Sequence, residues 1–271
     1  MKKRLLSLLM AAFMVTSLAA CGSTGSTSAA GSAASAEGSA ASAEGSAATT
    51  STTTSATGEA FKIGGTGPLT GGAAIYGTAV ARGLMATLGG RYALVVGCEA
   101  LSRLMDQTDR STCVLFGDGA GAAIFELCDA PFAITLGARG DEAIHAGGPC
   151  RTGSAPISMD GRAVFRFAVD ALPRCLHAVL DETQLALDDV DWVVCHQANS
   201  RIIDHCVRAL KADPAKFYKN MDRHGNTSAA SIPVALNELA ENGQLQPGQL
   251  LACIGFGGGL TWGGMIVEYK G

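Results

Sequence analysis

The strongest constraint on how this chain folds is a stretch that cannot form a core. Residues 22–58 contain only Gly, Ser, Ala, Thr and Glu, and the heptapeptide Gly-Ser-Ala-Ala-Ser-Ala-Glu fills residues 31–37 and again residues 38–44. No Leu, Ile or Val occupies any position of this seven-residue repeat, which excludes a coiled coil. Because the segment has no large apolar side chains to offset the entropy of ordering, we predict a disordered linker over residues 22–59.

Residues 1–21 combine the features of an export signal. Positions 2–4 are basic, residues 5–15 are apolar, and small residues precede Cys21. This order is typical of a secretory signal. The Leu-Ala-Ala-Cys ending resembles a bacterial lipobox, so we expect a lipoprotein signal peptide whose Cys21 is lipidated and anchors the chain to a membrane. A single membrane-anchoring helix is the alternative, although the apolar stretch is short for a span of about 20 residues.

Residues 60–71 follow the linker and indicate a short strand that enters a Gly-rich loop, with a helix from about residue 72. This pattern resembles the start of a periplasmic branched-chain amino-acid-binding protein. In that family the loop and the helix N-terminus hold polar groups of the substrate. We therefore assign residues 60–80 to the start of such a lobe.

The composition narrows the choice of ligands for the rest of the chain. A net charge of -4 gives no general attraction to nucleic acid or to anionic lipid, so we expect no nucleic-acid partner. No pair among the nine cysteines has the C-x-x-C spacing of a zinc or redox site, and we expect no metal. Most cysteines lie in apolar runs, where a free thiol behaves as a small buried hydrophobe.

Beyond residue 90, short apolar runs alternate with longer stretches of helical periodicity, which indicates an α/β fold. Helices are predicted from about residue 160, over residues 200–212 and over residues 228–242. Strands are predicted over residues 92–97, 112–116, 122–127, 132–136, 190–195, 250–256 and 261–269, with a turn at residues 117–121.

Two polar motifs lie at the ends of predicted elements. His196 follows a strand and Asn226 precedes a helix. In α/β sheets, sites gather where strands end, and an imidazole and a carboxamide there can donate hydrogen bonds to a thioester oxygen that becomes an enolate. Each residue also has a structural alternative, because a His after a strand can be a satisfied loop residue and an Asn before a helix can be its N-cap.

Five segments, in the same order and near the same spacing, resemble the beta-ketoacyl-acyl-carrier-protein synthase III family. They are Asp-Arg at 109–110, Phe-Gly-Asp-Gly-Ala-Gly-Ala at 116–122, His-Gln-Ala-Asn-Ser-Arg at 196–201, His-Gly-Asn-Thr-Ser-Ala-Ala-Ser at 224–231 and Gly-Phe-Gly-Gly-Gly-Leu-Thr-Trp-Gly at 255–263. The resemblance covers about residues 81–271. It implies a truncated thiolase-like αβαβα fold, with the remainder of the N-terminal half at 81–155 and the C-terminal condensing-enzyme domain at 156–271.

The resemblance also implies an activity and its site. The family starts fatty-acid biosynthesis in the cytoplasm as a homodimeric acyltransferase, by Claisen condensation of an acyl-CoA with malonyl-ACP and without a further cofactor. His196 and Asn226 match its decarboxylation pair, Phe256 lies beside the active site, and backbone N–H groups near Gly257 form an oxyanion hole. Three residues match positions that contact CoA, its pantetheine arm or the carrier protein, namely Arg110, Asn199 and Arg201.

The family's third catalytic residue, a cysteine at the N-terminus of a buried helix, has no match here. Counting back from Tyr92 without a gap places that position at Gly71, which cannot be acylated. Cys195 adjoins His196, but neighbouring side chains of a strand point to opposite faces, so we expect Cys195 in the core. The resemblance therefore implies an inactive synthase, or at most a malonyl-thioester decarboxylase.

Two other interpretations of the whole chain stay open. In the first, the chain is a fragment of a lipid-anchored branched-chain amino-acid-binding protein. In the second, it is a spurious gene fusion joined near residues 76–77. The two ends of the chain also predict different locations, because the N-terminal signal predicts an exported lipoprotein and the family predicts the cytoplasm.

Overall fold

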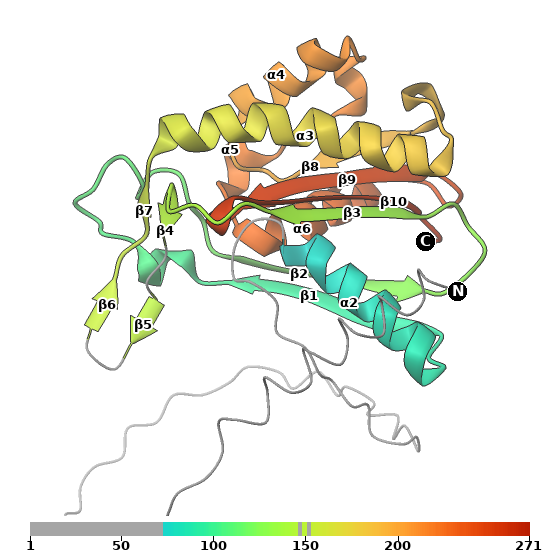
Figure 1. The fold of residues 1–271 in the computed structure, drawn as a ribbon, viewed down its shortest axis with the longest axis horizontal. Coiled ribbons are helices and arrows are strands. Elements are labelled where there is room, and N and C mark those ends of the chain that lie inside the picture. Colours follow the sequence, from blue (N-terminus) through green and yellow to red (C-terminus); the bar gives the residue numbers. More distant parts are fainter. Residues whose placement is uncertain (1–72, 146–147, 151–152) are drawn as a thin grey trace, which may run out of the picture. The chain divides into compact units, whose positions relative to one another are not determined.

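Helices and sheets alternate in four layers within the residues that the structure, a computed structural model, describes: 73–145, 148–150 and 153–271 (Figure 1). All three ranges fall within one unit of the chain, Phe61–Gly271. The layers are helices α3 (Gly161–Thr183) and α4 (Ser200–Leu210), a four-stranded sheet, helices α2 (Ala73–Leu88) and α6 (Ser231–Glu241), and a two-stranded sheet.

The four-stranded sheet has the order β3-β10-β9-β8 and lies at the centre of the core. Strand β8 runs parallel to β9, and the other neighbours are antiparallel. Its strands are β3 (Ala133–Ala138), β8 (Trp192–Cys195), β9 (Leu250–Gly257) and β10 (Thr261–Glu268). Strand β9 is buried along nearly its whole length, so the ends of β8 and β9 are fixed in place by packing from both sides.

Helix α3 begins and ends at well-defined caps and covers the outer face of this sheet. The Asp160 carboxylate accepts hydrogen bonds from the backbone N–H groups of Arg162 and Ala163, as an N-cap does. Gln184 ends the helix in a left-handed conformation. The helix predicted from about residue 160 is present, and its buried residues include Val164, Ala168, Leu172, Cys175, Leu176 and Val179.

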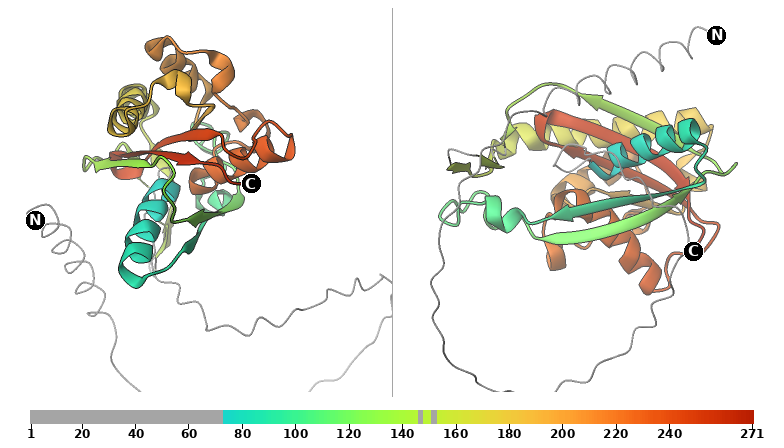
Figure 2. Two further views of the ribbon diagram at one scale, coloured as in Figure 1. Left: turned by 90° about the vertical axis from the view of Figure 1, so that its right-hand side faces the viewer. Right: turned by 90° about the horizontal axis from the view of Figure 1, so that it is seen from below.

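The second sheet consists of the antiparallel strands β1 (Tyr92–Glu99) and β2 (Gly119–Glu126), which run side by side in Figure 2. Helices α2 and α6 contact both sheets and form the layer between them. Smaller elements complete the described residues: the 3-10 helices η1 (Leu101–Leu104) and η4 (Ser228–Ala230), the helix α5 (Met221–His224), and the pairs β4 (Ile144–His145) with β7 (Ser158–Met159) and β5 (Gly148–Cys150) with β6 (Gly153–Ala155).

The strand predicted over residues 112–116 is wrong. These residues form turns, because Asp109 accepts hydrogen bonds from residues two to four positions further along the chain. Its carboxylate accepts hydrogen bonds from the backbone and hydroxyl of Ser111 and from the Thr112 hydroxyl, and its carbonyl accepts from the Cys113 N–H. Such local hydrogen bonds compete with strand pairing.

Strand β2 begins at Gly119, inside the stretch predicted as a turn. The glycines there serve close packing against the loop and helix that follow residue 226. A Cβ atom on Gly121 would lie 2.6 Å from Cβ of Pro233, and one on Gly119 would lie 3.0 Å from a methyl of Thr227. Glycine in this strand therefore lets the segment from Thr227 to Pro233 approach the sheet.

The N-terminal predictions mostly fall outside the described residues. The signal peptide at 1–21 with Cys21, the linker at 22–59, and Gly71 are not described. Helix α2 continues across the expected boundary between residues 80 and 81, and it also contains residues 76–77. In the part of the chain that the structure describes, none of the helices combines the length and hydropathy that a membrane span requires.

One face of the β1–β2 sheet is apolar and open. Leu94 and Ile124 lie opposite each other, with Val96 on the same face, and they keep 60%, 73% and 58% of their surface exposed. The αβαβα expectation places a helical layer here. Within the described residues no helix covers this face, so four of the five expected layers are present.

Ile254 and Ile124 form a matched pair that tests this division into core and open surface. Ile254 in β9 is fully buried, whereas Ile124 is mostly exposed. We expect Ile254→Ala to lower the free energy of unfolding by about 2–5 kcal/mol, because it leaves a cavity. Ile124→Ala should lower it by about 0.5 kcal/mol or less. Urea denaturation measures both values, and equal losses would contradict the layering.

Candidate functional site

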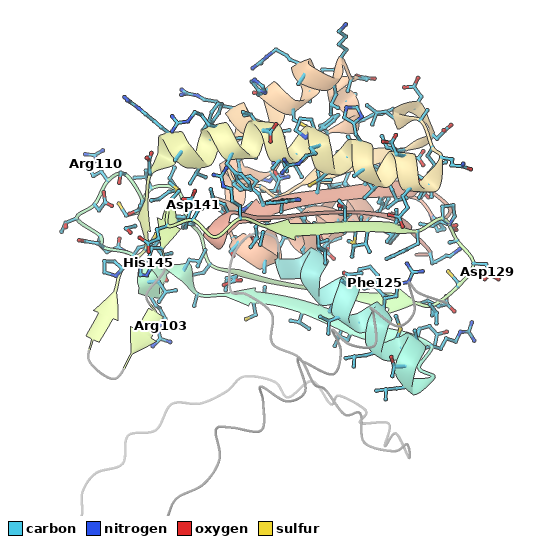
Figure 3. The ribbon with its side chains drawn as sticks, viewed as in Figure 1. Arg103, Arg110, Phe125, Asp129, Asp141 and His145 are labelled. Carbon is cyan, nitrogen blue, oxygen red and sulfur yellow. The ribbon has the colours of Figure 1, made fainter. Side chains whose placement is uncertain are left out.

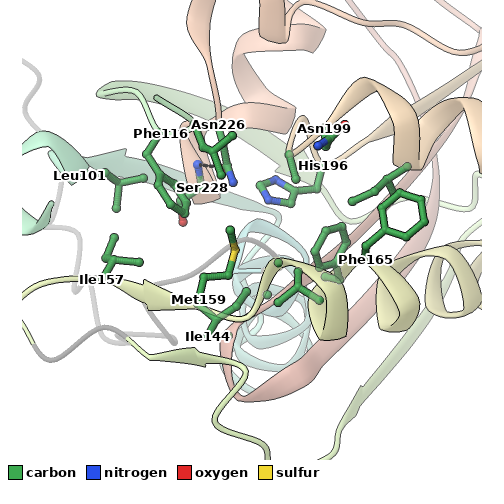
Figure 4. Close-up of a pocket in the computed structure, with 18 of the residues that line it drawn as sticks. Leu101, Phe116, Ile144, Ile157, Met159, Phe165, His196, Asn199, Asn226 and Ser228 are labelled. Atoms are coloured by element: carbon green, nitrogen blue, oxygen red, sulfur yellow. Dashed lines mark hydrogen bonds between the residues drawn. The ribbon is translucent and has the colours of Figure 1, made fainter. Parts of the chain in front are cut away.

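A cavity of about 210 Å³ lies where β8 and β9 end and where the loop before α6 begins (Figure 4). Its wall is mostly apolar and is assembled from segments far apart in sequence. The lining residues are Leu101, Ser111, Leu115, Phe116, Ile144, Ile157, Met159, Gly161, Val164, Phe165, His196, Ala198, Asn199, Ile202, Asn226, Ser228, Phe256, Gly257 and Gly258. A larger hollow of about 660 Å³ lies between α2, β2, α6 and β10, and none of the predicted site residues lines it.

His196 reaches this cavity from the end of β8. Its backbone N–H donates to the Ile254 carbonyl at 2.7 Å, which extends the β8–β9 pairing by one residue. His196 is 3% exposed as a residue. Its ring packs edge-on against the Phe256 ring, and its Nδ1 atom lies 2.7 Å from the Ser231 hydroxyl oxygen. Burial lowers the pKa of His196 to about 4, so the imidazole is neutral at pH 7.

Asn226 reaches the same cavity from a loop, and its amide is oriented by a backbone group. Its Oδ1 atom accepts a hydrogen bond from the Ser228 N–H at 2.9 Å, which turns the amide NH₂ group the other way. Backbone hydrogen bonds to Leu115 and Gly117 hold the loop, at 2.9 Å and 3.0 Å. A Cβ atom on Gly117 would lie 2.1 Å from the His224 carbonyl oxygen, so only glycine permits this approach.

The carboxylate of Glu238 on α6 holds the segment that precedes this loop. Desolvation raises its pKa, but the hydrogen bonds that it accepts outweigh this effect and lower the pKa to about 2. Its partners are His224 at 2.7 Å, Asn220 at 2.7 Å, Arg223 at 2.9 Å and Tyr218 at 3.0 Å. The network therefore joins α5 and the turn before it to α6.

Phe256 and Gly257, at the end of β9, line the cavity. Of the residues assigned to CoA or carrier contacts, only Asn199 does so. Its Oδ1 atom accepts a hydrogen bond from the Arg201 N–H at 2.9 Å, which makes it the N-cap of α4. Arg201 and Arg110 are exposed and do not line the cavity, and Arg110 lies on the loop between η1 and β2 (Figure 3).

No cysteine lines the cavity among the described residues. The prediction that Cys195 belongs to the core is confirmed, because it is fully buried and desolvation raises the pKa of its thiol well above the usual value. Three further buried thiols, Cys175, Cys206 and Cys253, have pKa values raised to about 12 by desolvation. Such thiols are not nucleophiles at neutral pH. The described residues also contain no cluster of metal-binding side chains.

Sequence reasoning missed the two serines that orient the pair. Ser228 and Ser231 both belong to the motif at residues 224–231, but nothing in their spacing assigned them a role. It also missed the apolar wall, because the segments that supply it carried no motif. Those wall residues are Leu101, Ile144, Ile157, Met159 and Phe165.

Comparisons with known proteins point to one family. A model of 3-oxoacyl-[acyl-carrier-protein (ACP)] synthase III matches residues 70–140, and a model of the C-terminal part of the same synthase matches residues 180–269. Curated beta-ketoacyl-[acyl-carrier-protein] synthases III of Clostridium beijerinckii and Erythrobacter litoralis are 41% and 42% identical to this chain over 208 and 205 residues. Each alignment covers 72% of this chain and 64% of the relative.

Solved structures of synthases III give the same result. That of Thermus thermophilus has a TM-score of 0.68 and 35% identity, and that of Aquifex aeolicus has 0.67 and 37%. They cover 73% of this chain, and 65% and 64% of their own chains. The predicted thiolase-like α/β fold is therefore confirmed, and the chain spans less than two thirds of the length of these relatives. The match begins at residue 70, inside the segment 60–80 that was assigned to a binding protein.

Burial of His196 fixes the sign of a pH effect on stability. Its folded-state pKa of about 4 lies below the usual 6.5, so between these values the unfolded chain binds a proton that the folded chain does not. The neutral, buried His196 therefore contributes about 3 kcal/mol to the free energy of unfolding above about pH 6.5. This contribution is lost as the pH falls from about 6.5 to about 4. Urea denaturation between about pH 7 and pH 4 should give a shallower decline for His196→Gln, and an unchanged decline would contradict the assignment.

Proposed function

Over residues 70–269 the chain belongs to the 3-oxoacyl-[acyl-carrier-protein] synthase III family, and we propose from this that it decarboxylates malonyl thioesters without completing a condensation. The observation that carries the proposal is the cavity shared by His196 and Asn226, whose described lining contains no cysteine. The pair fits the decarboxylation step of the family's reaction. The thiol that would carry the acyl group for the condensation is absent from that lining.

The proposed reaction needs two hydrogen-bond donors and no other catalyst. As the bond between the malonyl carboxylate and C2 breaks, carbon dioxide leaves and the electron pair moves onto the thioester oxygen. The Nε2–H group of His196 and the amide NH₂ group of Asn226 stabilise the resulting enolate oxygen. A proton from water then adds to C2 and gives an acetyl thioester. Each donor of this kind contributes about 3 kcal/mol in a dry site.

The surroundings of the pair suit this chemistry. Apolar side chains such as Phe165, Met159 and Ile157 line the cavity and exclude water, which strengthens hydrogen bonds to a developing charge. The same surroundings disfavour a carboxylate but not carbon dioxide, so they promote decarboxylation. Because His196 is neutral at pH 7, it donates a hydrogen bond without competing as an acid.

We place the substrate by the family's pattern. A malonyl group on CoA or on the acyl carrier protein reaches the cavity past Asn199, and the exposed Arg201 and Arg110 meet the anionic groups of the carrier protein and of CoA. Backbone N–H groups near Gly257 serve as a further oxyanion contact. Assembly as a homodimer in the cytoplasm belongs to the same proposal.

The origin and processing of residues 1–80 are the subject of a separate proposal. An export signal with a lipidated Cys21, a linker, and the start of a binding-protein lobe describe a lipoprotein end fused to the synthase part. The alternative is a recombined reading frame without a function of its own. Sequencing the locus across codons 70–85 tests the join, and mass spectrometry of the membrane fraction tests lipidation of Cys21.

Release of carbon dioxide from malonyl-CoA and malonyl-ACP tests the activity. We expect release by the purified full chain, and a fall of about 100-fold or more in the rate for His196→Ala or Asn226→Ala, because each removes one donor to the enolate. Thr183→Ala, at the far end of α3, is the control and should keep the activity. Release no faster than without protein, or equal release by all variants, would end the proposal.

Incubation with acetyl-CoA tests the absence of a nucleophile. We expect no acyl group on the protein by intact-mass spectrometry, because position 71 is glycine, no described cysteine lines the cavity, and the buried thiols have raised pKa values. Gly71→Cys supplies the missing thiol and should gain one acetyl group. An acetylated cysteine in the unchanged protein would show that a different residue replaces the nucleophile.

A further inference from the structure

We propose that Ser231, which does not line the cavity, is a positioning residue that fixes the tautomer of His196 by donating its hydroxyl proton to Nδ1. The ring proton then lies on Nε2 and faces the cavity. This inference rests on the proposed function, because it explains how the imidazole becomes a donor to the enolate oxygen. It concerns the state of the protein before any substrate binds, so it can be tested by itself.

The tautomer matters because the imidazole is neutral. A neutral ring carries one N–H proton, so one nitrogen donates and the other accepts. A donor to a developing oxyanion requires the proton on Nε2. With the proton on Nδ1, the Nε2 lone pair would face the enolate oxygen and repel it. The pair His196 and Asn226 therefore works in one of the two tautomers only.

Two contacts define the hydrogen-bonding state of the Ser231 hydroxyl. Its oxygen lies 2.7 Å from Nδ1 of His196 and accepts a hydrogen bond from the Gln197 N–H at 3.3 Å. Ser231 is 2% exposed, so solvent does not supply other partners. Among the described residues these are the two hydrogen-bond partners of the hydroxyl group.

This geometry favours donation from serine to histidine. If Nδ1 carried the proton and donated to Ser231, the oxygen would accept two hydrogen bonds and its own proton would have no acceptor. A buried hydroxyl proton without an acceptor is unfavourable. If Ser231 donates to Nδ1 instead, the oxygen accepts from Gln197 and every polar atom of the contact is satisfied.

The other side of the ring is consistent with this assignment. The Nε2 atom makes no hydrogen bond to a described residue, and the ring lines the cavity that Asn226 also lines (Figure 4). The edge-on contact with Phe256, at 5.4 Å between ring centres, holds the ring plane. Ser231 thus fixes the position of the ring proton and Phe256 fixes the ring plane. The amide of Asn226 is oriented separately, by the backbone N–H of Ser228.

¹⁵N NMR of the full chain labelled on histidine tests the proposal without substrate. At pH 7 we expect a pyridine-like shift for Nδ1 of His196 and a pyrrole-like shift for Nε2, assigned by comparison with His196→Gln. A pyrrole-like Nδ1 in the unchanged protein would overturn the inference, whatever the activity. The expected shifts in a protein that releases no carbon dioxide would leave it standing and overturn the proposed function instead.

Variants of Ser231 provide a second readout. We expect Ser231→Ala to move the Nδ1 shift and to lower kcat for carbon dioxide release by about threefold to tenfold, with KM unchanged, because the serine does not line the cavity. Ser231→Thr keeps the hydroxyl and should restore both, and Thr183→Ala is the matched control for the loss of a hydroxyl. An unchanged Nδ1 shift in a folded Ser231→Ala protein would contradict the role. If that variant does not fold, the shifts of the unchanged protein decide.

Discussion

The parallel pairing of β8 with β9 is the constraint on which the rest of the site depends. Cys195 at the end of β8 lies opposite Ile254, and the next hydrogen bond, from His196 to the Ile254 carbonyl, continues the pairing beyond the strand. Two residues later on β9, Phe256 meets the imidazole edge-on. The register of two buried strands thus places a polar ring in an apolar wall, and burial there lowers its pKa so that the ring is neutral at pH 7.

Asn226 is positioned next to this strand end by contacts of its loop with other parts of the chain. Its loop pairs with residues 115–117, which follow the turns built on Asp109, and Glu238 of α6 ties the preceding turn in place. Both contacts join segments that are far apart in the sequence. The site therefore exists only when the two-stranded sheet, α6 and the central sheet are assembled together.

Sequence alone predicted the parts that depend on local pattern. The strands that became β1, β8, β9 and β10 and the start of α3 carry apolar runs or caps that identify them. The strand prediction for residues 112–116 failed. These residues are as apolar as a buried strand, but local hydrogen bonds to Asp109 hold them in turns. The role of Ser231 was not predictable, because its partner lies 35 residues away and only packing brings them together. The open face of the β1–β2 sheet differs from the αβαβα expectation, because no helix among the described residues covers it.

The central claim is that an imidazole and a carboxamide converge on one oxygen in a cavity whose described lining contains no thiol. The most direct measurement is a crystal structure of the full chain with a stable malonyl-thioester analogue bound. The account predicts that Nε2 of His196 and Nδ2 of Asn226 both lie within hydrogen-bonding distance of the thioester oxygen. Side chains that bind different atoms, or a cysteine sulfur beside that carbonyl, would contradict it.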